Sequence, residues 1–335
     1  MPYAIAQPGS TISIKDEFAV KGIRLQNDAA PPTVTGATDA LARGLAYIEG
    51  RFVPIAEARI SVLDFGFTRS DATYDVVHVW QGRFFRLEAH LERFSASMRS
   101  LRLAPPESRA EMRAILIECV RRTGLRNAYV AMVCTRGQPP AGSRDMRLCR
   151  NQFIAYALPF VWLATPERQE RGIHAIVSSY VRIPARSVDP RVKNYHWLDL
   201  VQSQWQAYDR GADVAILLDL EGNVAEGPGF NVFAVSDGKV ATPEAGILEG
   251  ITRRSVLELS AALGVPAAAR PLASSELAEA DEIFLSSTAG GIIPVTRLDG
   301  RILGNDVPGP LTMRLREAYW ALHESDPEAV AVPYE

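Results

Sequence analysis

"WQGRFF", residues 80–85, contains a turn pattern that recurs along this 335-residue sequence. A polar residue and a glycine stand between two apolar, strand-forming runs, and glycine supplies the positive φ that a tight hairpin turn needs. The same arrangement recurs in IEGRFV (48–53), LEGNVA (220–225), SDGKVA (236–241) and LDGRIL (298–303). These recurrent turns predict a fold in which antiparallel sheet dominates.

Four stretches between the strands repeat apolar residues at helical spacing. They are Leu87–Leu101, the segment after PPES (105–108), Leu198–Tyr208 and Ile251–Gly264. Strands and helices do not alternate as in a doubly wound parallel sheet, so the sequence predicts an α+β protein of two domains.

We expect four parts along the chain. They are an N-terminal arm (1–44), a small α+β domain (45–160), an interdomain loop (161–173) and a large α+β domain (174–335). A cleft between the two domains is the natural place for a site.

The composition narrows the range of partners. A net charge of −3 gives no basic surface for nucleic acid, and no apolar run approaches the ~20 residues that a membrane span needs. Three widely spaced cysteines indicate neither a disulfide framework nor a zinc site, and five scattered histidines lack metal-ligand spacing. We therefore expect a cytoplasmic protein that binds small molecules and uses no metal.

Lys193, in DPRVKNYHWLDL (189–200), is one of only four lysines, against thirty-two arginines. Arginine stays protonated, whereas a lysine can lose its proton and become a nucleophilic amine. The start of the following helix would help to lower its pKa. The alternative is a solvated lysine at a helix start.

Further residues with chemical potential lie in three places. Glu226 follows an apolar strand in NVAEGPGFNVFAV and is either a ligand-facing carboxylate or an edge-strand side chain in water. GITRRS (250–255) and SSTAGG (286–291) offer N–H groups and hydroxyls that suit a phosphate, although a helix cap or a turn explains each one alone. Arg93 adds a cation. A tunable amine, a carboxylate in an apolar setting, two loops that suit an anion and an arginine are together what pyridoxal phosphate requires.

Seven motifs, in combination, resemble the fold type IV pyridoxal-phosphate enzymes, a class that includes branched-chain and D-amino acid aminotransferases. Within this class the sequence is most similar to (R)-selective amine transaminases. The resemblance implies that the sheet of the large domain is barrel-like. The motifs are AYIEGRFVP, ARISVLDFGFTRSDATYDVVHVW, FRLEAHLERF, VKNYHW, AEGPGFNVF, GITRRSVLE and STAGGIIPV.

The resemblance implies a role for each matching residue. Lys193 forms the imine with the cofactor and shuttles the proton, and Glu226 pairs with the pyridine nitrogen. Arg93, Ile251, Thr252 and Thr288 hold the phosphate. The substrate pocket contains Tyr74, Val76, Tyr129, Trp197 and Ala289, to which we add Arg69 and a mobile Arg144, with Arg136 as an alternative to Arg144.

The implied activity is amino transfer from an (R)-amine or a D-amino acid to a keto acid such as pyruvate, in ping-pong fashion through pyridoxamine phosphate. The implied assembly is a homodimer in which the neighbouring subunit helps to close each pocket. Arg69, His196 and Leu198 depart from the usual pattern and leave the preferred donor open. Alternatives are a branched-chain or D-amino acid aminotransferase, a lyase like aminodeoxychorismate lyase, or a phosphate-binding protein without catalysis.

Overall fold

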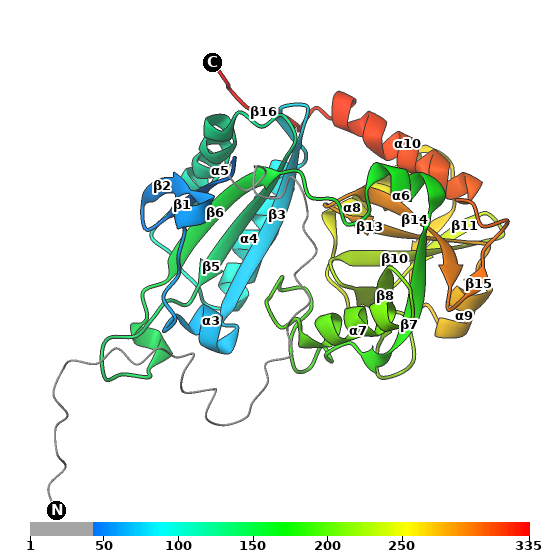
Figure 1. Ribbon diagram of the computed structural model, residues 1–335, viewed down its shortest axis with the longest axis horizontal. Coiled ribbons are helices and arrows are strands. Elements are labelled where there is room, and N and C mark those ends of the chain that lie inside the picture. Colours follow the sequence, from blue (N-terminus) through cyan, green and yellow to red (C-terminus); the bar gives the residue numbers. More distant parts are fainter. Residues whose placement is uncertain (1–42) are drawn as a thin grey trace, which may run out of the picture. The chain divides into compact units, whose positions relative to one another are not determined.

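A computed structural model describes residues 43–335 (Figure 1). The predicted N-terminal arm lies outside the described residues except for its last two positions. Within the described part, the chain forms two sheets with helices packed on them.

The first sheet has seven antiparallel strands in the order β16-β4-β3-β5-β6-β1-β2. Helix α4 packs on β3 and helix α5 on β6 (Figure 1). The elements are β1 (Leu45–Ile48), β2 (Arg51–Pro54), α3 (Phe65–Arg69), β3 (Ala72–Trp80), β4 (Arg83–Phe84), α4 (Leu87–Ser100), α5 (Arg109–Thr123), β5 (Ala128–Thr135), β6 (Gln152–Pro159) and β16 (Val330–Ala331).

The second sheet has nine strands, in the order β12-β11-β10-β13-β14-β7-β8, with β9 beside β10 and β15 beside β14. Most pairs are antiparallel, but β7 pairs in parallel with β8 and β14, and β11 pairs in parallel with β12. Its strands are β7 (Ile173–Val181), β8 (Val214–Leu218), β9 (Glu226–Gly227), β10 (Phe230–Ser236), β11 (Lys239–Thr242), β12 (Ala267–Ala269), β13 (Glu282–Ser287), β14 (Gly291–Leu298) and β15 (Arg301–Ile302).

Helices lie on this sheet as well: α7 packs on β7 and β8, α8 on β13, and α10 on β14 (Figure 1). The helices are α6 (Pro166–Arg171), α7 (Leu198–Asp209), α8 (Ile251–Ala262), α9 (Ser274–Glu279) and α10 (Pro310–Ser325). Phe233 and Phe284 stack with ring centroids 4.6 Å apart and pack with Val256 of α8. Burying an aromatic side chain of this size stabilises the fold by about 1.5–3 kcal/mol.

The hairpin prediction is confirmed at four of the five turns, which join β1 to β2, β3 to β4, β10 to β11 and β14 to β15. At Glu49 and Gly50 both φ angles are positive, 51° and 78°, as a tight two-residue hairpin requires. The fifth turn, at Glu221–Gly222, leads only to an isolated bridge between Leu218 and Val224.

The α+β fold class is confirmed, since two sheets and their helices occupy the described chain. The domain boundaries stay a prediction, because residues 43–335 fall within one compact unit. Two local features were not expected. Helix α6 lies inside the segment predicted as a loop, and β16 brings the end of the chain back to β4.

The apolar residues that recur at helical spacing on α7 are exposed: Leu198, Val201, Trp205 and Tyr208. Trp205 is 64% accessible and Leu198 69%, whereas Leu200, Ser203 and Ala207 form the buried face against the sheet. All three cysteines are free thiols. Within residues 43–335, the helices are too short or too polar to cross a bilayer.

Candidate active site

A cavity of about 290 Å³ brings most of the predicted site residues together. Both sheets contribute to its wall, through β3 and β5 of the first and β9, β10 and β13 of the second. The predicted residues that line it are Tyr74, Val76, Arg93, Tyr129, Lys193, Trp197, Glu226, Ile251, Thr252, Thr288 and Ala289. Arg69 and Arg144 do not line it.

Lys193 lies on a loop that is fastened to β3. Its carbonyl oxygen accepts hydrogen bonds from the Tyr74 amide (3.0 Å) and the Thr73 hydroxyl (2.7 Å), and its Nζ lies 4.6 Å from the centroid of the Tyr74 ring. Although the residue keeps some surface open to the cavity, protein atoms enclose the amine. This burial first, and the nearby Arg93 second, lower the pKa of Lys193 to about 8.

The alternative of a solvated lysine at a helix start is therefore wrong. Helix α7 begins only at Leu198, and burial is the main cause of the lowered pKa of Lys193. An amine with this pKa is partly deprotonated near neutral pH, which suits a nucleophile or a general base.

Glu226, on β9, is 6% exposed, so the interpretation as an edge-strand glutamate in water is also wrong. Its Oε1 accepts a hydrogen bond from Arg182 Nε and its Oε2 one from the Leu248 amide, both at 3.0 Å. Burial raises the pKa of Glu226, while Arg182 and the Leu248 amide oppose that rise. The carboxylate is thus held in place by a cation and a backbone donor.

Arg182 was not anticipated from the sequence. Besides Glu226, it binds Asp199 in the first turn of α7, with Nη1 2.7 Å from Oδ2. Asp199 Oδ2 also accepts a hydrogen bond from the Ile183 amide at 2.9 Å. This chain of contacts fixes the guanidinium that holds Glu226.

Arg93 is held by a buried acid that was also not anticipated. Its Nε and Nη2 each lie 2.8 Å from an oxygen of Asp75, and its Nη1 donates to the Glu249 carbonyl at 3.1 Å. His90 Nδ1 lies 2.8 Å from the same carboxylate. Burial alone would raise the pKa of Asp75, but Arg93 and His90 outweigh it and hold that pKa well below its usual range.

The N-terminus of α8 faces the cavity through Ile251 and Thr252. Its N-cap, Gly250, has no side chain, so the first amide N–H groups lack a side-chain cap. A Cβ at Gly250 would lie 2.1 Å from Asn231 Oδ1, which explains why only glycine fits there. Thr288 and Ala289, in the turn between β13 and β14, also line the cavity. This end of the cavity suits an anion.

The sequence profile of the family described as amino-transferase class IV matches residues 72–298, a span that contains Arg93, Lys193 and Glu226 and more than half of the chain. The chain belongs to the class IV aminotransferases. Enzymes of this class use pyridoxal phosphate.

Similar proteins carry two kinds of name. A putative branched-chain-amino-acid aminotransferase of Methanocaldococcus jannaschii is 35% identical over 275 residues, which cover 82% of this chain and 94% of that protein. A D-alanine aminotransferase of Bacillus licheniformis is 30% identical over 272 residues, covering 80% and 93%. The crystal structure of the branched-chain aminotransferase of Thermoproteus uzoniensis with norvaline has a TM-score of 0.79 and 30% identity, and covers 86% and 99%.

The cavity of this aminotransferase fits the cofactor in its donor set. Lys193 offers an enclosed amine, Glu226 a buried carboxylate, and α8 an open N-terminus. In addition, Ser286 lines the cavity, and its buried Oγ has no hydrogen-bond partner among the described residues. These groups match an aldehyde, a ring nitrogen and a phosphate.

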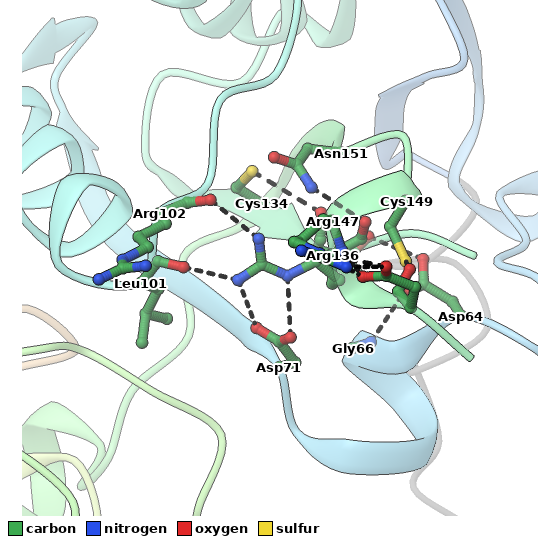
Figure 2. Close-up of polar contacts among 12 residues, drawn as sticks. Asp64, Gly66, Asp71, Leu101, Arg102, Cys134, Arg136, Arg147, Cys149 and Asn151 are labelled. Carbon is green, nitrogen blue, oxygen red and sulfur yellow. Dashed lines mark hydrogen bonds and ion pairs between the residues drawn. The ribbon is translucent and has the colours of Figure 1, made fainter. Parts of the chain in front are cut away.

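Three arginines of the aminotransferase that we connected with the substrate lie outside this cavity. The Arg136 guanidinium binds both oxygens of Asp71, at 2.8 and 3.0 Å, and donates to the Leu101 and Arg102 carbonyls (Figure 2). It is therefore a fixed structural residue. Arg69 is exposed and stacks on the Phe65 ring, 3.5 Å from its centroid, and Arg144 is exposed on the segment between β5 and β6.

Proposed function

We propose that this aminotransferase moves the amino group of an α-amino acid with an apolar side chain to a 2-oxo acid. The branched-chain type is supported by the names of the M. jannaschii and T. uzoniensis proteins. The observation that carries the proposal is the cavity itself, in which the Lys193 amine lies among the Glu226–Arg182 pair, Arg93 and apolar wall residues. The (R)-amine specificity expected first has no counterpart in these names and becomes the second candidate.

The residues of the chain have distinct tasks in this proposal. Lys193 holds the cofactor covalently and then, as a free amine, moves a proton from the substrate Cα. Glu226, fixed by Arg182, keeps a proton on the pyridine nitrogen. When bound, pyridoxal phosphate supplies the electron sink that makes the substrate Cα–H bond acidic. Arg93, Ile251, Thr252 and Thr288 orient the phosphate, and the wall of Tyr74, Val76, Tyr129, Trp197 and Ala289 receives the substrate.

A specific observation favours the second candidate, an (R)-amine donor. Among the described residues, Arg93 and Arg182 line the cavity, and carboxylates already pair with both. Arg182 pairs with both Glu226 and Asp199, and Arg93 is assigned to the phosphate, so neither guanidinium is left for a substrate carboxylate. An amino acid would then rely on neutral donors such as the hydroxyls of Tyr74 and Tyr129 to bind its carboxylate, whereas an amine without a carboxylate needs no such donor.

A panel of donors separates these candidates. The holoenzyme is mixed with L-leucine, D-alanine or (R)-1-phenylethylamine without an acceptor, and the visible absorbance of the cofactor follows the first half-reaction. We expect kcat/KM for L-leucine to exceed that for either other donor by at least tenfold, about 1.4 kcal/mol. A tenfold preference for (R)-1-phenylethylamine contradicts the first candidate and establishes the second.

We also propose that Arg144 holds the carboxylate of the acceptor. Support comes from its exposure and from its segment, TRGQPPAGSRD (135–145), whose glycine, proline and serine suit a movable loop. Since Arg144 does not line the cavity of its own chain, the loop must carry it there, or to the cavity of a second copy. Arg144→Ala should raise KM for pyruvate at least tenfold. Arg147→Ala is the matched control, because Arg147 is exposed two residues after that segment and bound to Asp145 at 2.6 Å. Equal effects of the two substitutions remove Arg144 from this role.

A homodimer is proposed as the active assembly. Exposed apolar side chains support it, on α7 (Val201, Trp205, Tyr208) and before and within α3 (Val62, Leu63, Phe67). Light scattering of the holoenzyme during activity measurements tests this. A monomer with full activity contradicts it.

A further inference from the structure

Ser286, near the end of β13, is the first residue of the SSTAGG segment, in which only Thr288 and Ala289 received individual roles from the resemblance. It is 2% exposed, it lines the cavity, and its Oγ is buried without a hydrogen-bond partner among the described residues. Buried hydroxyls in folded proteins almost always have a partner, so this exception calls for an explanation.

Strand alternation shows which way Ser286 faces. Ser286 stands two residues after Phe284 on β13 and opposite Asn231 on β10, which itself stands two residues before Phe233. Side chains two apart on a strand share a face, and Phe284 and Phe233 pack with Val256 of α8. Ser286 and Asn231 therefore face the side of the sheet that α8 covers.

Asn231 locates Ser286 relative to the start of α8. Its Nδ2 donates to the Leu248 carbonyl at 2.9 Å, and its Oδ1 occupies the space that a Cβ on Gly250 would need. Asn231 therefore lies against the N-cap of α8, and Ser286 is its direct cross-strand neighbour.

The groups around the start of α8 favour the binding of an anion. Ile251 and Thr252, in the first turn of α8, line the cavity, and the Arg93 guanidinium donates to the Glu249 carbonyl just before the N-cap. A helix N-terminus attracts anions, and a neutral hydroxyl beside it can donate to an anionic oxygen.

We propose that Ser286 Oγ donates a hydrogen bond to the phosphate of the cofactor and so completes the anion site. The inference rests on the cofactor that this enzyme class uses and not on the substrate proposed above. It predicts that the Ser286 hydroxyl strengthens the binding of a ligand only when that ligand carries a phosphate.

The test compares two ligands that differ only in the phosphate. Cofactor-free protein is titrated with pyridoxal phosphate and with pyridoxal, and the visible absorbance gives each Kd. Ser286→Ala should weaken pyridoxal phosphate binding about tenfold or more, which is typical for a lost hydrogen bond to a charged group, and should change pyridoxal binding less than twofold. Ser286→Cys keeps a side chain of similar shape with a weaker hydrogen-bond donor. Its Kd for pyridoxal phosphate should lie between those of the wild type and Ser286→Ala.

Ser260→Ala is the matched control. Ser260 is fully buried in α8, but its hydroxyl donates to the Val256 carbonyl at 2.8 Å, away from the cavity. This substitution should leave both Kd values unchanged.

The melting temperature of the cofactor-free protein provides a second readout. Removal of an unpartnered buried hydroxyl does not destabilise a fold, so Ser286→Ala should melt no lower than the wild type, and the shift on adding pyridoxal phosphate should shrink. Equal weakening of both ligands, or unchanged pyridoxal phosphate binding with a lower melting temperature, overturns the proposal. These measurements need no turnover, so they are independent of the donor that the enzyme prefers.

Discussion

Arg182 donates a hydrogen bond from Nε to Oε1 of Glu226 across 3.0 Å, and each side chain is less than a tenth exposed. A carboxylate taken out of water needs such a partner, since an uncompensated buried charge is strongly destabilising. The pair fixes the position of the Glu226 carboxyl group in the cavity, and it depends on an arginine forty-four positions away in the chain.

Arg182→Met should destabilise the cofactor-free protein by about 3 kcal/mol, because Glu226 and Asp199 both lose their cation. Urea unfolding at pH 7 measures the loss. Arg168→Met is the control, since Arg168 pairs with Asp213 at the exposed surface and should contribute under about 1 kcal/mol. Equal losses in the two variants would show that the buried Glu226 pair stabilises the fold no more than a surface pair does.

Asp75→Asn should weaken pyridoxal phosphate binding at least tenfold. The substitution removes the carboxylate that accepts two hydrogen bonds from Arg93, so the guanidinium loses its fixed orientation. Fluorescence or absorbance titration gives the Kd.

Asp71→Asn provides the comparison for Asp75. Asp71 accepts two hydrogen bonds of similar length from Arg136 (Figure 2). Neither residue lines the cavity. We expect Asp71→Asn to lower the melting temperature while the Kd for pyridoxal phosphate stays within twofold. An equal rise in Kd for both variants would mean that Arg93 acts only through the stability of the fold.

The lowered pKa of Lys193 makes stability depend on pH. The folded-state pKa is about 8 and the ordinary value is 10.5, so between these pH values the unfolded chain binds more protons than the folded one. Stability therefore rises with pH through this window, and below pH 8 the buried ammonium opposes folding by up to about 3 kcal/mol.

Lys193→Met should then stabilise the cofactor-free protein at pH 7, and its advantage over the wild type should shrink by pH 10. Urea unfolding of both proteins at the two pH values measures this. Lys239→Met is the control, because Lys239 is exposed on β11 and should show no such dependence. An advantage that does not change with pH contradicts the lowered pKa.

Gly250→Ala should weaken pyridoxal phosphate binding at least tenfold, since the new Cβ would overlap Asn231 Oδ1 and push the N-cap of α8 aside. Gly264→Ala, just after the other end of α8, meets no neighbour but has a φ of 68°, so it should cost about 1 kcal/mol of stability and leave the Kd unchanged. Titration and thermal melting separate these effects, and an unchanged Kd for Gly250→Ala would contradict the anion site.

The sequence predicts those parts of the fold that local chemistry decides. A polar residue and glycine impose a hairpin whatever surrounds them, and the spacing of α4, α5, α7 and α8 follows from periodicity alone. Periodicity locates an apolar stripe but does not say what covers it. The stripe on α7 containing Trp205 is exposed, because the sheet packs against Leu200 and Ala207 on another face.

The part of the site that was missed depends on pairs distant in the sequence. Asp75 and Arg182 are ordinary charged residues when read locally, and only tertiary structure brings them to Arg93 and Glu226. The one available signal for Asp75 was a charge inside the otherwise apolar strand TYDVVHV (73–79). Similarly, β16 pairs with β4 from the far end of the chain, which no local pattern can indicate.

The most direct test of the account concerns Lys193. Holoenzyme treated with borohydride fixes the cofactor irreversibly to the lysine that holds it, and mass spectrometry of tryptic peptides locates the added mass. Only four lysines exist in the chain: Lys15, Lys21, Lys193 and Lys239. We expect the label on the peptide that begins at Val192, with no label in Lys193→Ala and turnover lowered more than tenfold. A label on any other lysine, or a Lys193→Ala variant that keeps more than a tenth of the activity, contradicts the assignment.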